Sequence, residues 1–356
     1  MASGIQLRLK TLIKKFGLLA FSVLLLLAGL EVVLRVAPPA PTDNPIADRS
    51  PMFYRQAPDR AHPWSQGASN ALRIAVIGDS FTVGVGVQLD DTYGAKLERL
   101  LNLNDGVPPA DVSIYAHSGT STFQQRPLLR TAMATQPHVV ILGICLNDVE
   151  DWTHPLKIQR WRDEWMTPAP SPFAAFFLRR SRAASFIAAR LWASGSSKRC
   201  VAYYRHLYDP DGAGILRFKN AIGWFRDECA ARQIAFVPVI FPLMSFDFSP
   251  GRYPMAFAHD AIHGICRDYG IPCLDLLPAF QEDDPERMQA VPGIDPHPDE
   301  IAHRIAAETI LKYLVEQRLV DPGYQLVESG ANQFQHSLWL KTFQHVQHPQ
   351  ELDASH

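Results

Sequence analysis

The pattern of apolar residues divides the chain into an N-terminal stretch that is apolar throughout and a longer body in which short apolar runs alternate with helix-like segments. Residues 1–30 contain no acidic residue, and the apolar run 16–30 follows four basic residues, Arg8, Lys10, Lys14 and Lys15. With Glu31 at the membrane interface the stretch continues to Leu34, about 19 residues, enough to cross a bilayer. The basic flank predicts a cytoplasmic N-terminus and a body on the extracytoplasmic, periplasmic side.

The same N-terminal stretch also fits a secretory signal peptide. We favour an uncleaved anchor, because no small-x-small cleavage site is convincing and Pro38 and Pro39 would obstruct processing after Ala37. Four cations before an acid-free leucine run disfavour the buried helix of a soluble protein. We therefore expect a cytoplasmic flank and transmembrane anchor over residues 1–36 and an extended, proline-rich spacer over residues 37–70.

Five short runs rich in Val, Ile and Leu follow the spacer, at residues 72–77, 112–116, 139–142, 234–240 and 271–276. Because these runs are continuously apolar rather than alternating, they predict strands buried on both faces, hence a parallel sheet covered by helices. Helices are predicted at residues 92–101, capped by Asp91, and at residues 218–232, 255–269 and 299–317. The alternation predicts one α/β domain over residues 71–319, with ligands at the carboxyl ends of the strands.

Residues 151–217 interrupt this alternation with a helical insertion. Apolar residues at positions 173, 177, 184, 187 and 191 follow helical spacing, and the interval between Glu164 and Asp209 holds seven basic residues and no acidic one. One interpretation is a solvated insertion that covers the sheet edge. The other is a basic amphipathic lid that faces an anionic surface, either lipid headgroups or an acidic glycan. Residues 320–356 form a polar, aperiodic tail that suggests no function.

Charge and cysteine content narrow the possible partners. The net charge of −2 gives no global electrostatic support to a nucleic-acid partner. The five cysteines form no Cys-x-x-Cys and no zinc-ligand spacing, although Cys266 and Cys273 flank a helix-to-strand turn where pairing is open. His259 and His263 imitate a metalloprotease pattern without a clear third ligand. We therefore expect neither a metal nor a cofactor.

Candidate chemistry begins at Ser80, in Gly78-Asp79-Ser80, directly after the first predicted strand. Far downstream, Asp295-Pro296-His297 supplies an imidazole with a carboxylate two residues before it. A seryl hydroxyl is a poor nucleophile until a base takes its proton, and that base must be held in one tautomer. We predict Ser80 as nucleophile, His297 as base and then acid, and Asp295 as the group that orients the base. Asp299 is close enough in sequence to orient it instead.

An acyl-transfer site also needs donors aimed at the developing oxyanion. The candidates are the backbone N–H of Ser80, the backbone N–H of Gly119 and the side-chain amide of Asn147. Each follows one of the first three predicted strands, so all three converge on the same sheet edge. A glycine at position 119 lets the backbone approach a substrate closely. The alternative is that Gly119 is only a turn glycine and Asn147 only a loop residue.

Four sequence blocks resemble the SGNH/GDSL hydrolase superfamily over about residues 72–314. They are Gly78-Asp79-Ser80, Gly119-Thr120-Ser121-Thr122, Asn147-Asp148 and Asp295-Pro296-His297. The resemblance implies a flavodoxin-like sheet with strand order 2-1-3-4-5, a metal-independent mechanism, and ester substrates from lipids to acetylated glycans. Two features depart from the family's pattern. Gly143 lies four residues before Asn147 rather than closer, and Asp-x-His replaces the common Asp-x-x-His, a variant familiar among membrane-anchored acyl-transfer relatives.

These observations predict a membrane-anchored serine esterase that acts through an acyl-enzyme on an acyl ester of a cell-envelope glycan or lipid. An O-acyltransferase that modifies an envelope polysaccharide shares the acyl-enzyme and differs in the acceptor that resolves it. Outside the enzymes, the alternative is a non-catalytic glycan-binding module of the same fold. The sequence contains no metal-ligand cluster and no phosphate-binding loop that would support a further alternative, a phosphodiesterase-like lipase.

Overall fold

The computed structural model describes residues 2–36, 70–151, 195–281, 285–291 and 295–326, together with parts of residues 171–188. The expected spacer, residues 152–170 of the expected insertion and the end of the C-terminal tail lie outside these ranges. The chain divides into two compact units. One comprises residues 1–48 and 160–200, and the other comprises residues 49–159 and 201–356.

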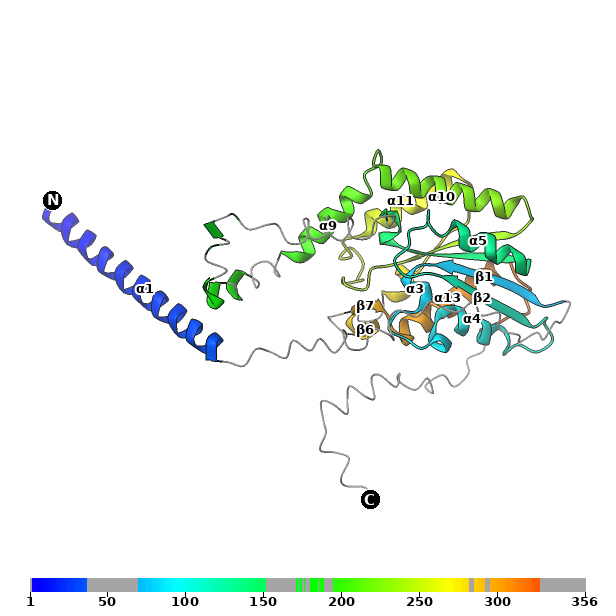
Figure 1. The fold of residues 1–356 in the computed structure, drawn as a ribbon, viewed down its shortest axis with the longest axis horizontal. Helices are drawn as coiled ribbons and strands as arrows, with labels where there is room; N and C mark the ends of the chain where they lie inside the picture. The colour runs from blue at the N-terminus through cyan, green and yellow to red at the C-terminus, as the bar shows by residue number, and fades with distance from the viewer. Residues whose placement is uncertain are drawn as a thin grey trace, which may run out of the picture. The chain divides into compact units, whose positions relative to one another are not determined.

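The second unit is built around a parallel five-stranded sheet with the order β2-β1-β3-β4-β5 (Figure 1). The strands are β1 (Leu72–Gly78), β2 (Ala110–Ala116), β3 (Val139–Cys145), β4 (Ala235–Phe241) and β5 (Leu274–Asp275). All seven residues of β3 are buried, which is why its sequence shows no alternation of apolar and polar positions. The expected fold class and strand order are confirmed.

Helices cover both faces of this sheet (Figure 1). On one face α4 (Tyr93–Leu101) packs against β2 and α13 (Glu300–Glu316), and α12 (Leu277–Phe280) packs against α13. On the other face lie α5 (Arg126–Ala132), α10 (Ala213–Ala230) and α11 (Ala256–Asp268), with α9 (Ser196–Leu207) leading into α10. Short helices are α3 (Ser80–Val83), η2 (Leu89–Asp91), η3 (Met133–Thr135), η4 (Leu146–Val149) and η5 (Pro285–Met288).

Several boundaries differ from those expected. Thr92, not Asp91, caps α4 by accepting a hydrogen bond from the backbone N–H of Ala95 at 3.4 Å, while Asp91 pairs with Lys96 at 2.9 Å. Strand β5 is shorter than its apolar run, since Pro272 has no N–H to donate to a ladder. Helix α10 begins at residue 213, so the last residues assigned to the insertion belong to a helix that packs on β4.

Two further features were not expected. Strands β6 (Gln289–Val291) and β7 (Asp295–Pro298) form a separate antiparallel pair just before α13. Beyond α13 the chain continues to pack on the body, because Tyr324 is buried and its hydroxyl donates to the carbonyl of Pro108 at 2.5 Å. The body of the second unit therefore extends past residue 319.

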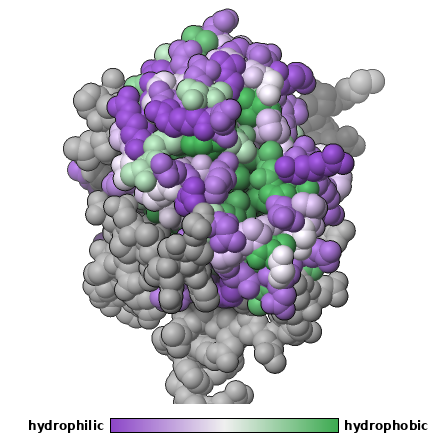
Figure 2. Space-filling view, turned by 90° about the vertical axis from the view of Figure 1, so that its right-hand side faces the viewer, coloured by the Kyte–Doolittle hydropathy of each residue, from purple (hydrophilic) through white to green (hydrophobic). Residues whose placement is uncertain are grey.

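The surface of the described body is mixed rather than uniformly polar. Figure 2 shows a face that is mainly hydrophilic, with hydrophobic side chains gathered in a band near its middle.

Helix α1 (Ala2–Val36) is the longest element of the first unit. Within its segment Lys14–Val36, a stretch of 18 residues has a mean hydropathy of 2.5, and none of that stretch is buried inside the protein. At 1.5 Å per residue these 23 residues span about 34 Å, slightly more than the hydrocarbon core of a bilayer. A helix of this length, composition and position is a candidate membrane anchor or signal sequence.

Candidate active site

Ser80 lies directly beyond the carboxyl end of the central strand β1. The strand ends at Gly78 and α3 begins at Ser80, with Asp79 as its N-cap, whose carboxylate accepts a hydrogen bond from the backbone N–H of Phe81 at 3.0 Å. The turn requires a glycine at position 78, because a Cβ there would collide with the side chain of Thr82. Ser80 is thus held at the first position of a helix, where its backbone N–H has no partner within that helix.

His297 connects this serine to a carboxylate. Its Nε2 lies 3.0 Å from Ser80 Oγ, and its Nδ1 lies 2.6 Å from Asp295 Oδ1. The same carboxylate oxygen accepts the backbone N–H of His297 at 3.1 Å. An Nδ1–H donated to Asp295 leaves Nε2 free to accept the seryl proton. The three side chains therefore have the order and spacing of a serine–histidine–aspartate triad.

The surroundings of His297 fix the imidazole further. Burial alone would raise the pKa of Asp295, but the side-chain hydrogen bond and the charge of His297 hold that pKa below its ordinary value. The ring of Phe81 packs edge-on against the imidazole, with centroids 5.5 Å apart. Sequence reasoning missed this contact, although Phe81 stands next to the serine. Asp299 does not compete for the base, because its carboxylate accepts two backbone N–H groups at the start of α13, each at 2.9 Å.

Gly119 and Asn147 follow β2 and β3, the two neighbours of β1 in the sheet. Gly119 has a φ of +70°, a conformation that favours glycine, and no atom lies within 4 Å of the position of a Cβ. Asn147 is half-buried in η4, and its Oδ1 finds no hydrogen-bond partner among the residues that the structure describes. The three candidate oxyanion donors thus follow three adjacent strands, at the edge where parallel sheets bind ligands.

Two buried acids accompany the serine. Burial raises the pKa of Asp79 to about 6, although the hydrogen bond from Phe81 and the charge of His297 oppose this shift. Ser80 Oγ also lies 3.4 Å from Asp79 Oδ2. Burial, with Asp79 nearby, raises the pKa of Asp148 well above its usual value, and Asp148 accepts a hydrogen bond from Thr122 Oγ1 at 3.0 Å. Asp79 thus caps α3, and Asp148 joins η4 to the segment that follows β2.

The histidine pair of α11 forms a separate cluster. Asp275, at the end of β5, accepts hydrogen bonds from His259 Nδ1 at 2.9 Å and from His263 Nε2 at 3.2 Å. Burial alone would raise the pKa of Asp275, but these hydrogen bonds hold it well below its usual range. No group of three or more metal-ligating side chains occurs among the described residues. The side chains of Cys266 and Cys273 are in hydrogen-bond contact, both as free thiols.

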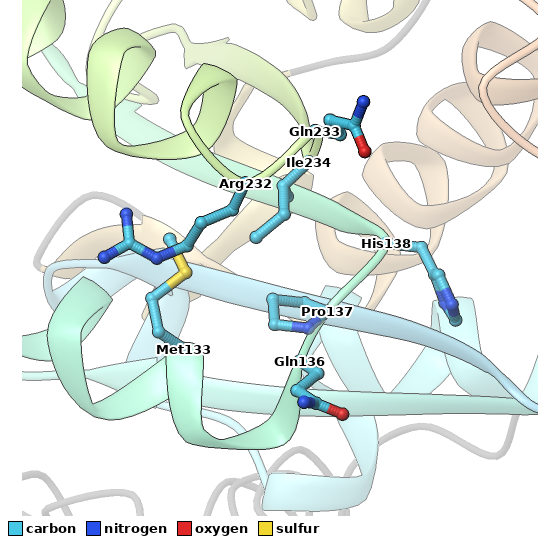
Figure 3. A pocket seen from close by; sticks show the side chains of 7 residues that line it. All are labelled: Met133, Gln136, Pro137, His138, Arg232, Gln233 and Ile234. Atoms are coloured by element: carbon cyan, nitrogen blue, oxygen red, sulfur yellow. The ribbon is translucent and has the colours of Figure 1, made fainter.

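An open hollow of about 510 Å³ lies before the amino ends of β3 and β4 (Figure 3). It is lined by Met133, Gln136, Pro137, His138, Arg232, Gln233 and Ile234. Burial and the charge of Arg73 lower the pKa of His138 below its ordinary value. This hollow is at the opposite sheet edge from Ser80 and contains no serine to act as nucleophile.

Residues 76–305 match the model of the GDSL-like lipase/acylhydrolase family, and this range includes all five candidate site residues. The chain belongs to that family. Among solved structures, this GDSL hydrolase is similar to the acetylxylan esterase Axe2 from Geobacillus stearothermophilus, with 16% identity and a TM-score of 0.41 over 67% of this chain and 92% of that chain. It is also similar to LAE5, an α/β hydrolase enzyme from the metagenome of Lake Arreo, Spain, with 14% identity and a TM-score of 0.42 over 67% and 93% of the two chains. No curated protein matches the GDSL hydrolase.

Proposed function

We propose that this GDSL hydrolase is a membrane-anchored serine esterase that acts through an acyl-enzyme on an acyl ester of a cell-envelope glycan or lipid. The observation that carries the proposal is the continuous contact from Asp295 through His297 to Ser80, at 2.6 Å and 3.0 Å. A module that only bound a glycan would have no need of an imidazole between a serine and a carboxylate. The candidate anchor and its basic flank support an extracytoplasmic substrate.

In the proposed reaction Ser80 Oγ attacks the carbonyl carbon of the ester while His297 Nε2 takes the seryl proton. The negative charge that develops on the carbonyl oxygen is stabilised by the backbone N–H groups of Ser80 and Gly119 and by the amide of Asn147. His297 returns the proton to the leaving alcohol as the ester C–O bond breaks, which leaves an acyl group on Ser80. His297 then deprotonates a water molecule that attacks the acyl carbon, and it returns this proton to Ser80 Oγ as the acyl C–O bond breaks and the acid is released. Asp295 stabilises the imidazolium in both steps.

The first experiment uses the full chain in detergent micelles with p-nitrophenyl acetate as the acyl donor. Nitrophenol release and protein mass are followed together for the parent, Ser80→Ala and His297→Ala. We expect an acetyl adduct on the parent and a loss of release of roughly 10⁴-fold or more in both variants. A parent with neither release nor adduct would contradict the esterase and favour the binding module. Acetyl transfer to added xylotriose or chitotriose, in preference to hydrolysis, would favour the O-acyltransferase.

The same assay separates the two aspartates that flank His297 in the sequence. Asp295→Asn should lower kcat by about 10²–10⁴-fold, because an amide cannot hold the imidazole in its productive tautomer or balance its charge. Asp299→Asn is the matched control, since the hydrogen bonds that its carboxylate makes with the described residues come from backbone N–H groups of α13. It should keep activity within a few-fold of the parent. The reverse result would make Asp299 the orienting group.

A further inference from the structure

The carboxyl-terminal end of α1 is bound to a segment about 150 positions downstream in the sequence. Glu31 accepts hydrogen bonds from Ser181 Oγ at 2.8 Å and from the backbone N–H groups of Arg182 and Ala183 at 3.2 Å and 2.8 Å. Ser181 Oγ in turn accepts the backbone N–H of Ala184 at 3.0 Å. One acidic side chain of the apolar helix thus organises the start of a helical stretch in the insertion.

Arginines reinforce this junction from both sides. Arg182 Nη1 donates to the carbonyl of Leu34 at 2.8 Å, and Arg35 Nη2 donates to the carbonyl of Arg180 at 3.1 Å. Arg35 Nε also pairs with Glu31 at 2.7 Å. All these residues belong to the same compact unit of the chain. Residues 180–184 are therefore fixed to the last turns of α1.

The position of Glu31 along α1 gives the depth of the junction. Glu31 lies five residues before Val36, where the apolar segment ends, a distance of about 7.5 Å along the helix axis. If α1 spans a bilayer, this is the boundary between acyl chains and headgroups. The junction then holds residues 180–184 at the point where the chain leaves the membrane.

The side chains on either side of the junction suit that environment. Phe173 is 75% exposed and Phe176 is 47% exposed, and Phe186 and Ile187 are also exposed. The guanidinium of Arg180 lies 3.8 Å from the centre of the Phe176 ring. Exposed aromatic rings beside arginines are typical of a segment in the membrane interface, where rings contact acyl chains and guanidinium groups reach phosphates.

We propose that the described residues of segment 171–188 form a membrane-interfacial element that Glu31 holds against the outer leaflet, with Phe173 and Phe176 among the acyl chains and Arg180 and Arg182 at the lipid phosphates. The proposal rests on the membrane anchor of the proposed function. It favours lipid over an acidic glycan as the anionic surface, because the segment is tied to the exit of the membrane helix.

The test reconstitutes the full chain in liposomes of phosphatidylcholine and phosphatidylglycerol that contain a phospholipid with a diazirine near the head of an acyl chain. After irradiation and proteolysis, mass spectrometry locates the lipid adducts. We expect adducts on peptides from α1 and on peptides from residues 171–188. Peptides that contain Leu103, which is 46% exposed in the other unit, should carry none.

Two variants make the test specific. A double variant, Phe173→Ser with Phe176→Ser, should lower lipid labelling of residues 171–188 by about tenfold. Each phenylalanine ring that enters the acyl chains removes apolar surface from water and so stabilises the bound segment. Glu31→Ala should lower this labelling as well, because the tether is lost. Leu103→Ser is the matched control and should change nothing. All three variants should retain parent activity on p-nitrophenyl acetate, which shows that the catalytic unit is folded.

The outcomes separate the interfacial element from the anchor. Adducts on α1 with none on residues 171–188 would overturn the interfacial element and leave the anchor intact. Adducts on neither segment would overturn the anchor and the interfacial element together. A third outcome would be that residues 171–188 carry no lipid adduct but are protected from trypsin by added polygalacturonate. That result would identify an acidic glycan as the partner instead.

Discussion

Asp299 illustrates how an acid close to a catalytic histidine in the sequence can serve the fold instead. It is 4% exposed and caps α13 through two backbone N–H groups. Burial raises its pKa from 3.8 to about 7, with a further contribution from the charge of Glu300, while the capping hydrogen bonds and Lys96 oppose the shift. In the folded protein this carboxyl group therefore remains protonated at pH values where the unfolded chain has already released the proton.

This difference predicts a pH-dependent effect of Asp299→Asn on stability. Asparagine keeps the cap and cannot ionise. Between about pH 4 and pH 7 the folded parent binds a proton that the unfolded chain lacks, so this group's contribution to the free energy of unfolding falls as the pH rises. Between pH 5 and pH 8 the variant should therefore gain about 3 kcal/mol of stability over the parent, because about two pH units of this interval lie below the folded pKa of about 7. Thermal unfolding of both proteins in the same micelles at pH 5 and at pH 8 measures this difference in stability. An equal difference between variant and parent at the two pH values would refute the prediction.

The elements that sequence could predict are those whose signal is local. Each central strand is one buried apolar run, and the residues that follow β1, β2 and β3 sit where the end of a parallel strand must place them. For this reason the sequence alone predicts that Ser80, Gly119 and Asn147 lie at one edge of the sheet. The sequence does not decide the cap of α4, because aspartate and threonine are both good capping residues. In the structure Asp91 pairs with Lys96, and Thr92 accepts the capping hydrogen bond.

Other elements depend on packing between distant segments and have no local signal. The hairpin β6–β7 carries both His297 and Asp295, yet its strands have three and four residues, two of which are prolines in β7. So short a pair is marginal alone and forms only where the body supports it. The contact of Glu31 with Ser181 joins positions 150 residues apart, which no periodicity in either segment encodes.

The junction of β3 with α3 and α4 allows a test of how closely these elements must pack. A Cβ at Gly143 would collide with the Tyr93 hydroxyl and would lie 2.7 Å from Thr82 Oγ1. These two hydroxyl groups form a hydrogen bond of 2.8 Å with each other. Gly143→Ala should therefore cost about 1–3 kcal/mol of stability. It should also lower activity, because Thr82 lies in the helix that begins with Ser80.

Gly264→Ala, within α11, is the matched control for Gly143→Ala. The nearest atom to its added Cβ is Arg267 Nη2 at 3.9 Å, so the alanine fits without displacement. It should raise stability by about 0.5–1 kcal/mol, as expected for a glycine replaced inside a helix. Thermal unfolding and p-nitrophenyl acetate turnover measure both variants. If Gly143→Ala matches the control, the close packing at this junction has no part in holding Ser80.

The chain combines a sheet whose apolar residues are buried by its own helices with a helix whose apolar residues the described part of the chain leaves exposed. The core of the catalytic unit is formed by its own strands and helices, whereas Leu18, Leu24 and Leu26 of α1 are each more than half exposed. Exposing such a helix to water would be costly at about 25 cal/mol per Å² of apolar surface. Removal as a signal peptide or retention in a bilayer both resolve this cost. The contacts of Glu31 favour retention, since cleavage would discard the residue that organises the insertion.

Retention makes a prediction for the intact protein. Chain purified from bacterial membranes after alkaline extraction should have the mass of the uncleaved polypeptide, 39.8 kDa. In vesicles that expose the extracytoplasmic face, protease should digest the catalytic unit. In inverted vesicles it should reach only the basic residues before Phe16, because positively charged flanks of membrane helices stay in the cytoplasm. Glu31→Ala should remain equally membrane-bound, since α1 alone supplies the anchor, yet become easier to cleave between residues 171 and 188. A shorter, soluble product would instead show that α1 is a signal sequence and that the contacts of Glu31 are lost on maturation.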